Sequence, residues 1–209
     1  MCGTALTKRL WILAGILAPI AYTAAVITGG ALMPGYSHVR DPISSLTQTG
    51  APVIPVVVGL FTAYSWLLLV FAAGLWLRWR RRGHRLAAAG TLALVAVALA
   101  GALMYWFAQD PIGAPLTTRG LGHLILAGVA ALGTIVGVLL SGLGFRRISG
   151  LASLRAYSVA SAALIFVSGG IGTATLSFNP YFGVFERVTI FTFIIWTLVV
   201  ALRLARTVE

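Results

Sequence analysis

Residues 86–108 read LAAAGTLALVAVALAGALMYWFA and contain no charged side chain. A helix needs about 20 consecutive apolar residues to cross the hydrocarbon core of a bilayer, and this run is long enough. Five other runs share its character, at 10–33, 53–77, 120–145, 156–178 and 188–204. They are too long for barrel strands, and lipid offers no partner to open backbone groups. The sequence therefore predicts an all-α polytopic membrane protein, a bundle of six transmembrane helices.

The composition supports this interpretation. Of the 209 residues, 59% are hydrophobic and 9% are charged, with a mean hydropathy of +0.98. A soluble domain carries about 25% charged residues, so lipid must cover most of this chain. The length suits one integral membrane domain over residues 1–209. We expect a multi-pass protein of the cell membrane with membrane lipids as its surroundings.

The net charge of +11 does not predict a nucleic-acid partner. The basic residues stand in short clusters between apolar runs, whereas a nucleic-acid surface needs a continuous basic stripe. The single cysteine, Cys2, allows no intramolecular disulfide and no cysteine-based metal site. Membrane topology accounts for the charge better.

Orientation follows from the basic residues of the loops, which gather on the cytoplasmic side of membrane proteins. All of the 15 Lys and Arg residues except Arg40, Arg119 and Arg187 lie at the termini or in the second and fourth loops. Both termini are therefore expected inside, with three helical hairpins turning outside. The run 10–33 follows Lys8 and Arg9 as in a signal peptide, but its length favours retention; cleavage stays open.

The expected outer loops gather the scarce polar chemistry. The first reads YSHVRDPISSLTQ over residues 36–48 and carries Asp41. Asp110 and Glu186 fall on the same side, as do His38 and His123. Sorting of positive charge explains the basic loops, but it does not explain this gathering.

The outer loops also repeat a pattern. Asp41-Pro42-Ile43 recurs as Asp110-Pro111-Ile112, and Asn179-Pro180 follows at the same spacing. Proline forces the preceding residue out of helix, and Asp or Asn can cap the next helical turn. The repeat therefore indicates three similar turns, in which the acids are either plain caps or parts of a site.

These loops carry a resemblance to a known family, the DUF998 family of bacterial and archaeal membrane proteins. The residues that carry it are Pro34, Gly35 and Tyr36, followed by Pro42, Ile43, Ser44, Ser45 and Leu46. An acidic-proline loop after the third run, His123 opening the fourth and Glu186-Arg187 opening the sixth extend it. The resemblance implies six transmembrane helices, and it implies no activity.

His123 is the most specific candidate for chemistry. It is expected one turn into the fourth helix, where an ionisable group usually faces a cavity or a partner. Asp110 is the nearest expected partner, and a carboxylate–imidazole pair can act as a general base. Asp41 and Glu186 complete the candidate catalytic set. The candidate substrate-binding residues are His38, Arg40, Ser44, Ser45, Tyr105, Trp106, Arg119 and Arg187.

Other interpretations of these residues remain open. In a structural interpretation, His123 is a packing histidine, and Glu186 pairs with Arg187, Arg119 or Arg40 near a helix N-terminus. No metal and no cofactor are expected, because no HxxxH or HxxE spacing occurs. A serine hydrolase built on Ser44 or Ser45 lacks a G-x-S-x-G element. A cyclase would use Asp110 near Tyr105 and Trp106.

The sequence therefore supports two functional hypotheses. In the first, an outward-facing polar pocket recognises a lipid or isoprenoid-like substrate, with acid–base chemistry of a lipid-modifying or cyclase type as an extension. In the second, the protein is a structural, accessory or small-transporter membrane protein whose outer residues only cap and pair. No acid lies deep in a span, which argues against a charge-coupled transporter. Whether the protein is an enzyme and its oligomeric state stay open.

Overall fold

A computed structural model describes residues 5–52, 54–111, 113–175 and 180–207. Its long helices are α1 (Ala5–Leu32), α2 (Ile54–Arg81), α3 (Arg85–Leu103), α4 (Thr118–Phe145), α5 (Leu154–Thr175) and α6 (Phe182–Thr207). A short 3-10 helix, η1 (Ile43–Thr47), lies between α1 and α2. All six long helices are apolar enough to cross a membrane, and the described residues form no strand. The prediction of an all-α, six-helix membrane protein is confirmed.

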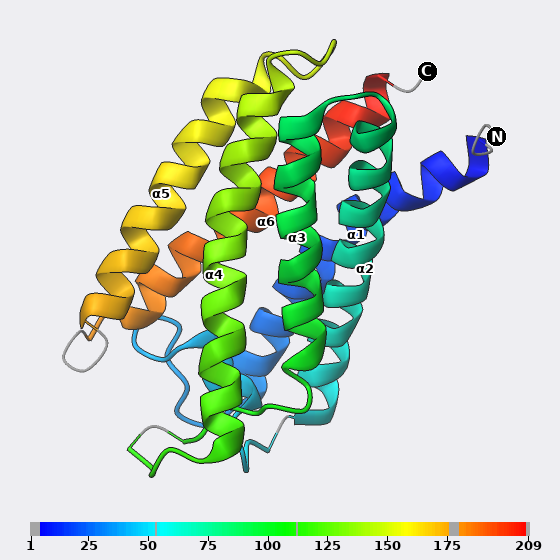
Figure 1. Cartoon of the computed structure of the whole chain (residues 1–209). Helices are drawn as coiled ribbons and strands as arrows, with labels where there is room; N and C mark the ends of the chain where they lie inside the picture. The colour runs from blue at the N-terminus through cyan, green and yellow to red at the C-terminus, as the bar shows by residue number, and fades with distance from the viewer. Residues whose placement is uncertain (1–4, 53, 112, 176–179, 208–209) are drawn as a thin grey trace.

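The helices run up and down in one bundle (Figure 1). Each helix packs against the next along the chain, and α6 packs against α1, which closes the ring. Both chain ends and the α2–α3 and α4–α5 links lie at one end, called here the basic end. Asp41, Asp110 and Glu186 lie at the opposite end, the acidic end, with η1 and the α3–α4 link. The assignment of the basic end to the cytoplasm stays a prediction.

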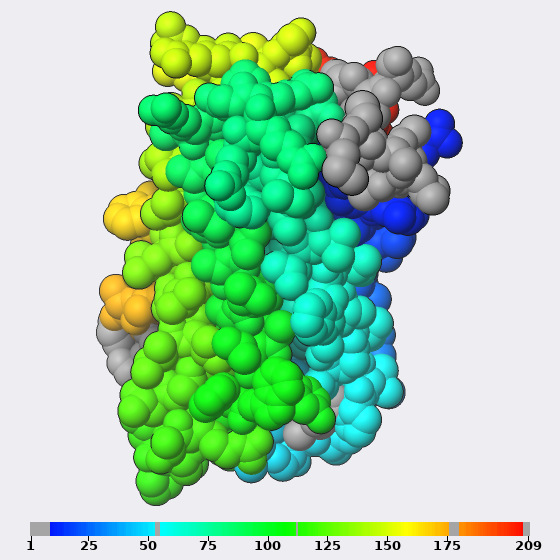
Figure 2. Space-filling model, turned by 45° about the vertical axis from the view of Figure 1, so that its right-hand side comes forward, coloured from blue at the N-terminus to red at the C-terminus, as the bar shows by residue number. Residues whose placement is uncertain are grey.

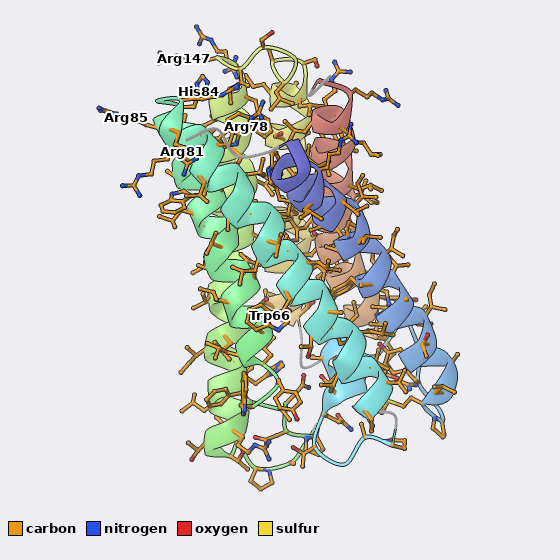
Figure 3. All side chains as sticks on the ribbon, turned by 90° about the vertical axis from the view of Figure 1, so that its right-hand side faces the viewer. Trp66, Arg78, Arg81, His84, Arg85 and Arg147 are labelled. Carbon is orange, nitrogen blue, oxygen red and sulfur yellow. The ribbon has the colours of Figure 1, made fainter. Side chains whose placement is uncertain are left out.

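The bundle presents an apolar surface around its middle. In Figure 2 the side chains of α2, α3 and α4 close over one face. Trp66 of α2 is 54% exposed and lies at mid-helix (Figure 3). Leu132 of α4 and Phe166 of α5 are also exposed. Trp196 of α6 is instead fully buried and stacks on Phe145. Exposed apolar rings at mid-helix suit a lipid environment rather than water.

Small residues bring α3 and α4 close together. A side chain at Gly90 of α3 would overlap the backbone nitrogen and hydroxyl of Ser141 in α4. Gly137, one turn before Ser141, packs on Leu94 and the Gly90 carbonyl. Small residues on α3 and α4 therefore allow these two helices to pack closely.

Two helix boundaries differ from the sequence prediction and matter for the site. The third helix ends at Leu103 and not at 108, so Tyr105 and Trp106 lie in a turn. The sixth helix begins at Phe182 and not at 188, so Glu186 and Arg187 lie inside it. The predicted end of the fifth helix, at 178, and the Asn179 turn lie outside the described residues.

Candidate functional site

The acidic end contains two groups of polar side chains. The α6 cluster joins the loop after α1 to α6 through Tyr36, His38, Asp41, Glu186 and Arg187. The α4 cluster joins the loop after α3 to α4, and it consists of Asp110, Thr117 and His123.

Arg187 lies at the centre of the α6 cluster. Its Nη2 donates to the Tyr36 hydroxyl at 2.5 Å and to His38 Nδ1 at 3.1 Å. Its Nη1 donates to the Asp41 carbonyl at 3.0 Å and to the Gly183 carbonyl at 2.9 Å. The guanidinium also lies over the Tyr36 ring, 5.6 Å from its centre. Arg187 therefore fastens the loop to the second turn of α6.

His38 and Tyr36 serve this arginine as acceptors. Because His38 Nδ1 accepts from Arg187, its ring proton lies on Nε2. Burial, and then the Arg187 charge, lower the pKa of His38 from 6.5. Burial raises the pKa of Tyr36 to about 12, against the opposing effect of Arg187. Tyr36 also donates to the Pro42 carbonyl at 3.1 Å. At neutral pH both side chains are uncharged and engaged.

Asp41 folds back onto its own loop. Its carboxylate accepts from the Ser37 amide at 2.8 Å and from Arg40 Nε at 2.7 Å. This is the one ion pair in the described part of the chain. The hydrogen bond from Arg40 leads the effects that lower the pKa of Asp41. The alternative in which Asp41 caps the next helical turn is wrong, because η1 begins at Ile43 and its N-cap residue is Pro42, without a side-chain cap hydrogen bond.

Glu186 is held by backbone and not by an arginine. Its Oε2 accepts from the Ile43 amide at 2.5 Å, at the start of η1. The predicted ion pairs with Arg187, Arg119 or Arg40 are absent from the described residues. Glu186 does not open the sixth helix, because α6 starts four residues earlier, at Phe182. Glu186 therefore ties η1 to α6, beside the contacts of Arg187.

Asp110 organises the start of α4. Its two carboxylate oxygens accept from the Thr117 amide at 2.7 Å and from the Thr117 hydroxyl at 2.8 Å. Thr117 is the N-cap of α4, and its hydroxyl oxygen accepts from the Gly120 amide at 3.1 Å. The predicted cap after Pro111 is therefore replaced by a longer arrangement, in which Asp110 holds the capping threonine.

His123 is buried in α4, with 7% of its surface exposed. Its Nδ1 lies 3.0 Å from the Phe107 carbonyl, which can only accept, so the proton is on Nδ1. Among the described residues, no hydrogen bond joins His123 to Asp110. The predicted carboxylate–imidazole pair is replaced by a bond to backbone. Nε2 makes no hydrogen bond within the described residues.

The remaining predicted binding residues fall into separate places. Ser45 is buried and donates to the Pro42 carbonyl, and Ser44 only accepts from Thr47 through its carbonyl. Neither serine makes a hydrogen bond to a histidine among the described residues. Tyr105 and Trp106 are each 58% exposed, and Arg119 Nε donates to the Trp106 carbonyl at 3.3 Å. These three line an open hollow of about 330 Å³ between the α3–α4 link and residues 47–50, called here the acidic-end hollow.

The structure does not unite the predicted catalytic set. Asp41 and Glu186 belong to the α6 cluster, whereas Asp110 and His123 belong to the α4 cluster. A backbone bond from the Thr49 amide to the Gln109 carbonyl at 3.0 Å connects the two loops. Over the described ranges, no three His, Cys, Asp or Glu side chains are grouped to hold a metal ion.

Sequence reasoning missed two members of these clusters. Tyr36 enters the sequence analysis only as part of the family motif, although its position just before the charged loop is a signal for a partner of arginine. Thr117 is absent from the predicted residues, although a threonine directly before a long apolar run is a recognised helix-start signal. Both were hidden because their partners come from other parts of the chain.

Comparison with known proteins adds the family. Neither the curated proteins nor the solved structures contain a match. A family model described as "Protein of unknown function (DUF998)" matches residues 16–203, from within α1 to within α6. The match covers most of the chain and both polar clusters, and the six membrane-spanning helices fit an integral membrane family. The chain therefore belongs to the DUF998 family.

Proposed function

We propose that this membrane protein binds an amphipathic, lipid-like or isoprenoid-like molecule with an acidic headgroup at its acidic end. The observation that carries the proposal is the acidic-end hollow, which combines one arginine with two exposed aromatic rings. Its volume of about 330 Å³ lies within the range of about 300–1,000 Å³ for small-molecule sites. The surrounding lipid supplies amphipathic molecules directly.

The chemistry of the lining supports such a ligand. Arg119 uses its Nε on the Trp106 carbonyl, which leaves the Nη groups to bind an anionic headgroup. Tyr105 and Trp106 stand nearly perpendicular, with ring centres 5.2 Å apart, and offer apolar faces to a chain. Aromatic side chains of this kind prefer the membrane interface, where a headgroup meets its chain.

Acid–base catalysis is the second candidate function, and one observation favours it. The ring of His123 is oriented by the hydrogen bond of Nδ1 to the Phe107 carbonyl, and its Nε2 makes no hydrogen bond within the described residues. A general base needs this kind of fixed ring with one free nitrogen. By contrast, the carboxylates of Asp41 and Glu186 are already bound to groups of the fold. Recognition is therefore the better supported function, with His123 as the first residue to test for chemistry.

The binding proposal is tested by identifying lipids that copurify with the full chain. Mass spectrometry would compare wild type, Arg119→Gln and Arg40→Gln, all purified in the same mild detergent. Arg40 is the matched control, because it lies at the same end but pairs with Asp41 outside the hollow. We expect one acidic amphiphile to be retained by wild type and Arg40→Gln and lost from Arg119→Gln. Equal retention by all three proteins would contradict the proposal.

The catalytic candidate needs a separate comparison. Membrane extracts from cells with wild type, Asp110→Asn, His123→Ala or no protein would be profiled by untargeted mass spectrometry. A lipid or terpenoid species that changes only with the wild type would establish an enzyme, provided that both variants fold. Identical extracts from cells with well-folded proteins would leave binding as the function.

A further inference from the structure

A second hollow lies at the basic end, independent of the site proposed above. Its volume is about 520 Å³, and it opens between the α2–α3 link, the α4–α5 link and the end of α6. The cationic side chains in its lining are Arg78 and Arg82, and His84 lines it as well. Buried apolar side chains of Ile148, Leu151 and Leu204 form the opposite wall.

Two buried N–H donors in this lining have no hydrogen-bond partner among the described residues. Trp79 is fully buried, and its indole Nε1 is one of these two donors. Nε of the neighbouring Arg78 is also buried and unpaired. The Arg78 guanidinium lies over the Trp79 ring, 5.3 Å from its centre, so the two residues form one unit. Buried donors are nearly always paired in folded proteins, so this pair indicates an absent acceptor.

The charges of the hollow point the same way. Arg78 and Arg82 are near enough to repel each other. The acids of the described chain lie at the opposite end of the bundle, and none lines the hollow. At the rim, the Gly150 carbonyl already accepts a hydrogen bond from Arg203 Nε at 3.1 Å. Water could satisfy single donors, but it would not neutralise two neighbouring guanidinium groups.

Sorting of positive charge does not explain this arrangement. That rule requires basic residues at one end of the bundle and is indifferent to where their side chains point. Arg81 and Arg85 satisfy it while they point away from the helices, whereas Arg78 and His84 lie together where the links meet (Figure 3). The partly buried position of Arg78 therefore needs a separate reason.

We propose that this basic-end hollow binds a phosphate group, carried by an anionic phospholipid headgroup or by a free phosphate compound. Guanidinium groups bind phosphate oxygens through paired N–H donors, and a tryptophan Nε1 adds a donor that cannot repel the anion by a lone pair. Basic pockets between transmembrane helices bind anionic headgroups in this way. The volume admits a headgroup larger than one phosphate, and the apolar wall can contact its glycerol or first chain carbons.

The test measures binding to the purified full chain in a zwitterionic detergent. Inorganic phosphate and dioctanoyl phosphatidic acid are the two probes, and dioctanoyl phosphatidylcholine is the comparison lipid. The variants are Arg78→Gln and Arg82→Gln, matched by Arg81→Gln and Arg85→Gln from the same end. Because Arg82 is exposed, its substitution should leave folding intact. Trp79→Phe removes only the N–H donor and keeps most of the ring.

We expect phosphatidic acid to bind the wild type, with Kd about tenfold weaker for Arg78→Gln and Arg82→Gln, which is typical for loss of a bond to a charged group. Trp79→Phe should weaken binding several-fold, and the two control variants should stay near wild type. Binding of inorganic phosphate as well assigns the site to phosphate itself, whereas binding of the lipid alone assigns it to a headgroup. The proposal is overturned if neither probe binds, if phosphatidylcholine binds equally, or if the control variants lose as much affinity.

Discussion

Within the described residues, Arg187 makes four hydrogen bonds to four different groups, and three of those groups belong to the loop after α1. A neighbouring arginine, Arg40, makes its bonds at the surface to its own loop. The difference separates a side chain that holds two elements together from one that only pairs locally. It also explains why Glu186 and Arg187, although adjacent, do not pair: each faces a different backbone target of the loop.

Replacement of Arg187 should therefore destabilise the acidic end. Arg187→Gln leaves His38 Nδ1 and the Asp41 carbonyl without their donor, and we expect a loss of about 2–4 kcal/mol in the free energy of unfolding. Arg187→Lys should rescue little, because a point ammonium cannot replace a planar fork. The measurement is unfolding of the purified protein in detergent, with Arg40→Gln as the control. A loss no larger than that of Arg40→Gln would contradict the role given to Arg187.

The same contact predicts a pH dependence. The pKa of His38 is lowered in the folded protein, so the unfolded state binds its proton more readily, and acid destabilises the folded loop. Stability from His38 is fully present above its ordinary pKa of 6.5 and is lost as the pH falls through the lowered value. Asp41, whose pKa is also lowered, loses its contribution in a separate window below its ordinary 3.8.

His38→Asn tests this dependence, because an amide oxygen can accept from Arg187 but does not titrate. The melting temperature of the wild type should fall more than that of His38→Asn between about pH 7 and about pH 5. Parallel curves for the two proteins would show that His38 does not titrate against Arg187.

At the scale of the element, the start of α4 depends on two linked residues. Thr117 caps the helix, and Asp110 holds Thr117 by its amide and its hydroxyl. We expect Thr117→Ala to cost about 1 kcal/mol, as cap removal usually does. Asp110→Ala should cost a similar amount, and the double variant should cost less than the sum, because both act on one cap. A double-mutant cycle of unfolding free energies measures this coupling. If the two losses simply add, Asp110 does not act through the Thr117 cap.

The elements also show what could be predicted from the sequence. The six helices can be predicted from the long apolar runs, because a helix satisfies its own backbone hydrogen bonds and lipid offers none. The start of α6 at Phe182 does not follow, because its first turns contain Gly183, Glu186 and Arg187. Those turns are held by the loop after α1: the Gly183 and Val184 amides donate to the Arg40 and Val39 carbonyls at 3.3 and 3.1 Å. Hydropathy cannot detect a helix turn whose partners lie elsewhere in the chain.

The same limit applies to the candidate site. The sequence predicts three acids and two histidines at one end, and the structure agrees for Asp41, Asp110, Glu186, His38 and His123. It could not predict their partners, because most of the bonds run to backbone amides and carbonyls, which every residue carries. Pairs of opposite charge are visible in a sequence, whereas a carboxylate that binds a distant amide is not.

At the scale of the whole molecule, the two hollows lie at opposite ends of one closed ring of helices. Because the helices have lengths that match a bilayer, the two ends should face opposite sides of the membrane. If the basic end faces the cytoplasm, its hollow is open to the inner leaflet and to the phosphate compounds dissolved in the cytoplasm. The orientation therefore decides which molecules each hollow can meet.

Labelling of single cysteines tests this orientation in whole cells. In a Cys2→Ser background, Ala114→Cys places a thiol at the acidic end and Ser149→Cys places one at the basic end, both at exposed positions. If the basic end is cytoplasmic, a membrane-impermeant maleimide should label Ala114→Cys in intact cells and Ser149→Cys only after permeabilisation. The positive-inside rule gives this direction, because all but three of the 15 basic residues lie at or near the basic end. The reverse pattern would turn the phosphate hollow to the outside and the amphiphile hollow to the inner leaflet.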